Sequence, residues 1–146
     1  MTNHLRLVVV LLTIALIPVR LSAQALSAEE LRAYTHFLTR LADPGVPADV
    51  VERRLRHVAQ SFHLTSSELS ALKTMALQYR TTLAALVSQE QTLLGGKATL
   101  PKESEVLQNS LLQQRDDAIR TLVPGYLTAV RPDTVARFKA LAHLYK

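Results

Sequence analysis

Apolar residues recur every three or four positions along most of the chain, a spacing that places them on one face of an α-helix. No segment alternates polar and apolar residues over six or more positions, which is the pattern of a half-buried strand. The pattern predicts an all-α fold: a small helical bundle built around a long antiparallel helical hairpin, with short N- and C-terminal helices. The loops between the predicted helices are brief, so we expect one domain.

Two of the predicted helices begin at a capping box, in which an N-cap hydroxyl and a glutamate three residues later cap each other's backbone amides. Ser27 with Glu30 forms the first, and Thr65 with Glu68 forms the second. No breaking residue follows the second box before Gly95, which predicts a helix of about 29 residues, roughly 43 Å long. A helix of this length is typical of one arm of a hairpin.

Prolines and turn residues mark the other helix ends. Residues 43–45 (Asp-Pro-Gly) end the first helix, and Pro47 fits the first turn of a second helix that stops near residue 61. Pro101 precedes the fourth helix, which we expect to kink or break at Pro124, and Pro132 begins the last. Pairs of opposite charge four residues apart are expected on the helix surfaces, namely Asp49 with Arg53, Glu52 with Arg56, and Asp116 with Arg120.

The first 25 residues have the composition of a cleaved signal peptide. Arg6 supplies a positive start, residues 7–19 are uncharged and apolar, and Ala23 and Ala25 are the small residues that a signal peptidase requires. Cleavage is predicted after Ala25, which leaves residues 26–146 as a single helical domain. An uncleaved anchor is the alternative, although the apolar run falls short of the roughly 20 residues that cross a bilayer.

Cleavage changes the charge balance. The chain has 146 residues with 17 basic and 12 acidic side chains, a net charge of +5. Removing Arg6 and Arg20 leaves 15 basic residues against 12 acids, a net charge of +3.

An exported chain is expected to be periplasmic or secreted, with no nucleic-acid partner and no stable membrane insertion after cleavage. It has no cysteine, which excludes disulfides, thiolate metal sites and a thiol nucleophile.

Candidate chemistry is sparse. Ser70 and Lys73 match the S-x-x-K pattern of penicillin-recognising enzymes, but the companion S-D-N and K-T-G motifs are absent. No two histidines lie three or four residues apart, so no helix face presents two imidazoles to a metal. We therefore predict no catalytic, cofactor-binding or metal-binding residues, and a protein that is not an enzyme.

The densest basic cluster lies in the second predicted helix, at Arg53, Arg54, Arg56 and His57. One interpretation is a patch for an anionic partner, such as an acidic protein segment or lipid headgroups. The other is a solvated helix face that Asp49 and Glu52 partly neutralise.

Two helix starts resemble the motif of a known family. Leu64, Thr65 and Glu68 resemble an LTxxQ sequence with Glu in place of Gln, and the segment around Pro132 resembles a degenerate second copy. From Leu64 onward the chain is similar to the small periplasmic stress proteins of the Spy and CpxP kind. This resemblance implies ATP-independent binding of unfolded or stress-related client proteins, often as a homodimer.

Two hypotheses follow. The first is a non-enzymatic protein that binds other proteins, which predicts an exposed apolar groove flanked by arginines. The second is an oligomeric structural or scaffold protein whose hairpin packs against another copy through apolar residues of the long helix, namely Leu69, Leu72, Tyr79, Leu83 and Leu86.

Overall fold

The computed structural model describes residues 25–95 and 101–144, and in this part of the chain the turns connect only helices, without strands. The prediction of an all-α bundle is confirmed. The helices are α1 (Ala28–Ala42), α2 (Ala48–Ser61), α3 (Ser66–Leu94), α4 (Pro101–Thr128) and α5 (Pro132–Leu144). None of the described helices is long and apolar enough to cross a membrane.

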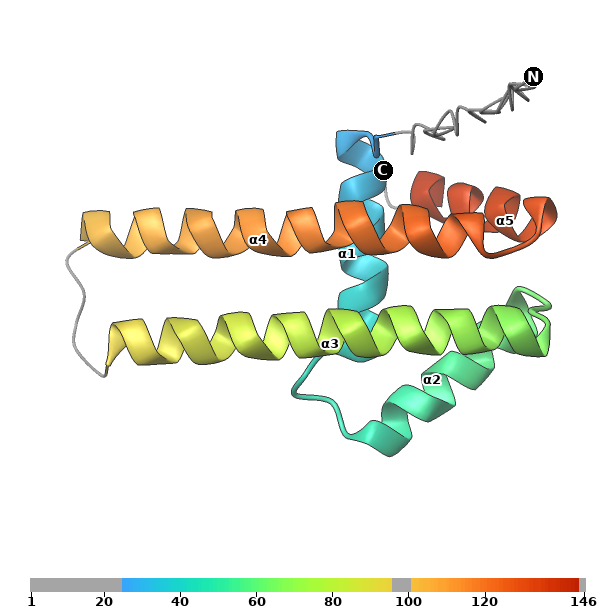
Figure 1. Cartoon of the computed structure of the whole chain (residues 1–146), viewed down its shortest axis with the longest axis horizontal. Coiled ribbons are helices and arrows are strands. Elements are labelled where there is room, and N and C mark those ends of the chain that lie inside the picture. Colours follow the sequence, from blue (N-terminus) through green and yellow to red (C-terminus); the bar gives the residue numbers. More distant parts are fainter. Residues whose placement is uncertain (1–24, 96–100, 145–146) are drawn as a thin grey trace, which may run out of the picture.

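The hairpin of α3 and α4 is the longest feature of the fold (Figure 1). Helix α1 crosses it near its middle and also packs against α2 and α5, so α1 contacts each of the other four helices. The Thr39 hydroxyl of α1 lies 2.8 Å from the Tyr79 hydroxyl of α3 at this crossing. The three shorter helices therefore gather at one half of the hairpin.

Local signals determine where the helices begin and end. Both predicted capping boxes are present, at Ser27 with Glu30 and at Thr65 with Glu68. Helix α3 has the predicted 29 residues and ends at Gly95. The backbone of Gly95 is left-handed, a conformation that glycine adopts at little cost.

Helix α4 does not break at Pro124, where the sequence predicted a kink or break. The helix continues to Thr128. Proline removes the backbone hydrogen bond to the carbonyl of Arg120, and Arg120 is an exposed residue. Val123 and Tyr126 on either side are buried in the core, and this packing holds the last turn in helical conformation.

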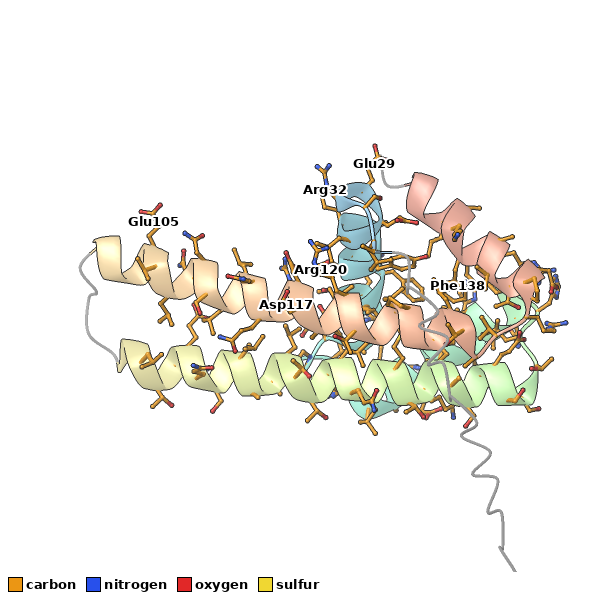
Figure 2. The ribbon with its side chains drawn as sticks, turned by 45° about the horizontal axis from the view of Figure 1, so that its top comes forward. Glu29, Arg32, Glu105, Asp117, Arg120 and Phe138 are labelled. Atoms are coloured by element: carbon orange, nitrogen blue, oxygen red, sulfur yellow. The ribbon has the colours of Figure 1, made fainter. Side chains whose placement is uncertain are left out.

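Phe138 of α5 lies at the centre of an aromatic cluster, on the side of α5 that faces the hairpin (Figure 2). Its ring stacks on Phe62 at 4.8 Å between centroids and meets Phe37 and Tyr126 edge-on at 5.6 and 5.2 Å. These rings come from α1, α4, α5 and the end of α2, so the cluster joins four helices. Such aromatic pairs add about 0.5–1.5 kcal/mol each beyond the area that they bury.

Only α3 and α4 extend beyond the crossing of α1 (Figure 1). We call residues 83–94 of α3 and 101–115 of α4 the outer arm, and its first residue, Leu83, still packs against the core. Leu86 is buried there, but it lies outside the main core cluster. Apolar side chains remain exposed on the outer arm, namely Val87, Leu93, Val106 and Leu112.

Two of the three predicted surface pairs are wrong. Asp49 pairs with Arg53 as expected, at 3.3 Å. Glu52 instead pairs with Lys73 of α3 at 2.9 Å, because α2 packs against α3 and brings that ammonium within reach. Asp116 pairs with its neighbour Arg115 at 2.8 Å rather than with Arg120.

Candidate functional site

The two segments that resemble the LTxxQ motif lie together, although about 65 residues separate them in the sequence. Glu68, at the third position of α3, is 2% exposed and points at the start of α5. Its carboxylate accepts hydrogen bonds from the backbone amides of both N-cap residues, Thr65 at 2.8 Å and Arg131 at 2.9 Å. One carboxylate therefore caps two helices, at the end of each dipole where negative charge is favoured.

Side chains of the α5 start complete the environment of this carboxylate. The Arg131 guanidinium donates to Glu68 through Nε and Nη2, both at 3.0 Å, and the Thr134 hydroxyl donates at 2.9 Å. These hydrogen bonds, led by the guanidinium, hold the pKa of Glu68 far below its usual range although burial opposes the charge. Glu68 is thus ionised at neutral pH, and both of its carboxylate oxygens accept hydrogen bonds.

The other motif-like positions are structural neighbours of Glu68. Thr65 is the N-cap of α3, and its hydroxyl oxygen accepts a hydrogen bond from the Glu68 backbone amide. Leu64 packs against the core beneath the turn, and Pro132 is the exposed first residue of α5. From the sequence, the two motif-like segments were predicted as separate helix starts, whereas the fold brings them together in a single junction.

Arginines also fix turns, both at this junction and between α1 and α2, by donating to carbonyls that lack an intrahelical partner. Arg131 donates to the carbonyl of His63 at 3.0 Å, and Arg137 donates to that of Phe62. Arg80 likewise donates to the carbonyls of Asp43 and Pro44, at 2.8 and 3.1 Å. Several guanidinium groups of this chain therefore bind its own backbone.

An open groove of about 700 Å³ lies between α1, α2 and the end of α5. Its apolar lining comes from all three helices and from the end of α2, namely Phe37, Leu41, Val50, Val58, Phe62 and Leu141. Its polar lining is basic apart from one serine, and it consists of Arg40, Arg53, Arg54, His57 and Ser61. Within the described part of the chain, no carboxylate lines it.

The groove contains most of the predicted basic cluster. Arg53, Arg54 and His57 line it, whereas Arg56 is exposed on α2 and does not. Arg54 also donates to the carbonyl of Arg40, which ties α2 to the last turn of α1. Sequence reasoning missed Arg40, because a lone arginine at a helix end carries no local signal and only the packing of α1 against α2 places it here.

The other candidate residues do not come together in a catalytic or metal-binding arrangement within the described part of the chain. Lys73 donates to the Glu52 carboxylate of α2 at 2.9 Å, and no hydrogen bond joins it to the Ser70 hydroxyl within the described residues. No group of three or more metal-ligating side chains converges within the described residues. Of the predicted cleavage residues, Ala23 lies outside the described residues, and Ala25 is exposed next to buried Leu26.

No family model, curated protein or solved structure matches this chain. The resemblance to the Spy and CpxP kind therefore stays a prediction, and the case for function depends on the geometry of the chain itself.

Proposed function

We propose that this chain is an exported, non-enzymatic helical protein that binds other proteins, in the manner of an ATP-independent periplasmic chaperone or stress accessory. The groove between α1, α2 and α5 carries the proposal. It combines an apolar lining with a basic rim and is open to solvent. Concave apolar surfaces with a few polar groups are where proteins bind ligands and peptide segments.

The lining favours binding over catalysis. Its one hydroxyl and one imidazole, Ser61 and His57, lie four residues apart on α2, and both are exposed. No hydrogen bond joins these two side chains, and no carboxylate in the lining orients the imidazole. A serine nucleophile is typically activated by an adjacent base that a third group orients.

Aggregation suppression tests the proposal. The purified exported protein is mixed in stoichiometric amounts with several unfolded clients, without ATP, and light scattering is followed. We expect suppression by the native protein and its loss in Val58→Glu, which places a charge in the apolar lining of the groove. Val87→Glu makes the same change on the exposed outer arm and is expected to keep the activity. Absence of suppression for every client would reject the chaperone form of the proposal.

The outer arm favours a second candidate, an oligomeric structural or scaffold protein. The arm has a shallow apolar pocket of about 330 Å³ between its helices, lined in part by Leu83, Leu86, Leu111 and Leu112. The interface first expected along α3 needs correction, because Leu72 and Tyr79 are fully buried within the chain. Sedimentation at micromolar concentration tests this candidate, and association that Val87→Glu abolishes would support it over the groove.

A further inference from the structure

We propose that the occupant of the groove is an acidic amphipathic helix of a partner protein. This inference rests on the proposed function and names the chemistry of the partner. Three observations carry it: the one-sided charge of the rim, the two rows of side chains along α2, and the helical nature of all the walls.

The charge of the rim selects an acidic partner. Three guanidinium groups and an imidazole line the groove, and no carboxylate is among its described lining residues. Neither Arg40 nor Arg54 forms an ion pair with an acid among the described residues. Arg53 pairs with Asp49, but both side chains are more than half exposed, and such pairs are weak enough to exchange partners. The groove thus offers several cations that its own lining does not neutralise.

The rows along α2 set the length of the occupant. Val50, Arg54 and Val58 follow one another at intervals of four residues, and Arg53, His57 and Ser61 form a parallel row. These rows extend over about three helical turns, or roughly 16 Å. Val50 and Val58 add to the apolar lining that α1 and α5 provide, whereas Arg54 and the second row are polar. Apolar side chains flanked by basic ones are complementary to a helix with an apolar stripe and acidic residues along its flank.

The walls select a helix over an extended segment. Helices α1, α2 and α5 form the groove, and their backbone groups are bonded within each helix. An extended peptide gains affinity by pairing its backbone with a free sheet edge, which these walls do not offer. A helix satisfies its own backbone and needs only side-chain contacts.

The lining also argues against other anionic partners. Single-stranded nucleic acid binds by stacking its bases on exposed aromatic rings, but Phe37 is buried and Phe62 is already stacked on Phe138. A bilayer surface presents headgroups on a broad front, whereas the apolar lining here is recessed between three helices.

The experiment measures binding of three synthetic peptides of about 14 residues to the exported protein, by fluorescence anisotropy and circular dichroism. The first is an amphipathic helix with leucines on one face and glutamates on the flanks. The second replaces the glutamates with lysines, and the third scrambles the first so that the apolar stripe is lost. We expect the first peptide to bind about tenfold more tightly than either control and to gain helicity on binding. Added salt should weaken this binding.

Charge-reversal variants locate the site. We expect the double variant Arg40→Glu with Arg53→Glu to bind the acidic peptide about tenfold or more less tightly. The control is the double variant Arg32→Glu with Arg120→Glu, two residues labelled in Figure 2 that do not line the groove. It changes the net charge by the same amount and is expected to leave peptide binding unchanged. Thermal melting of both double variants shows that each is folded, and the peptide comparison on the native protein does not depend on either.

Several outcomes would overturn the inference. Equal binding of the lysine peptide would reject the charge argument, and equal binding of the scrambled peptide would reject the helix. Binding of anionic vesicles without peptide binding would replace the partner with a membrane surface. Self-association that Val58→Glu abolishes would place a second copy in the groove. If no peptide binds but Val58→Glu still abolishes client protection, this inference fails while the proposed function stands.

Discussion

The carboxylate of Glu68 accepts two hydrogen bonds from the guanidinium of Arg131 and a third from the Arg131 backbone amide. The two residues lie 63 positions apart and join the N-terminus of α3 to that of α5. Charge-assisted bonds of this kind are roughly twice as strong as neutral ones. Here they also close the end of the bundle where the α2–α3 and α4–α5 turns meet.

Replacing Glu68 with glutamine is expected to destabilise the protein by about 2 kcal/mol, because it removes the charge that four polar groups of the α5 start and the α3 cap are directed at. Chemical denaturation measures this free energy of unfolding. Glu30→Gln is a matched control, since Glu30 occupies the same position in the α1 capping box but caps only its own helix. It should cost less than about 1 kcal/mol. Equal losses in the two variants would show that the link to α5 contributes nothing.

The pKa of Glu68 predicts an acid-dependent stability. Because its folded pKa lies far below the ordinary value of 4.5, this carboxylate stabilises the fold fully above that value. The contribution is lost progressively as the pH falls below 4.5 toward the folded pKa. Melting temperatures of the native protein and Glu68→Gln should therefore differ at neutral pH and converge in acid. A difference that stays constant from neutral to acidic pH would contradict this assignment.

Helix boundaries and the fold class were predictable because their signals are local. The capping boxes, Gly95 and the apolar stripes lie within a few residues of the ends that they determine. Long-range partners were not predictable, since Glu68 needs Arg131 and Glu52 finds Lys73 across a helix interface rather than Arg56 one turn away. The groove has the same cause: only the packing of α1 against α2 brings Arg40 to the predicted basic cluster.

Among the aromatic residues of the core, truncation of Phe138 is predicted to lower the free energy of unfolding the most. Phe138→Ala removes a ring that contacts three others, and it should lower the free energy of unfolding by about 3–5 kcal/mol. Leu77→Ala removes a side chain that is 64% exposed, and should change stability by less than about 0.5 kcal/mol. A small effect at Phe138 would mean that the cluster repacks around the space left.

Processing after Ala25 can be tested by mass spectrometry of the protein isolated from an exporting host. Replacing Ala23 and Ala25 with phenylalanine should retain the longer precursor, because a signal peptidase accepts only small side chains at these positions. Replacing both with serine keeps the side chains small and should leave processing intact. A native product that begins anywhere other than Leu26 would move the predicted cleavage site.

The position of α1 at the middle of the hairpin divides the chain into parts of unequal local stability. Backbone amides of α3 near Tyr79 are covered by α1 and the core, and they should exchange with deuterated solvent only on global unfolding. Amides of the outer arm farther from α1 lie outside the main core cluster and should exchange through openings of lower free energy. Such openings would expose the leucines between the two arm helices without disturbing the junction at Glu68, so one end of the molecule can fluctuate while the other stays closed.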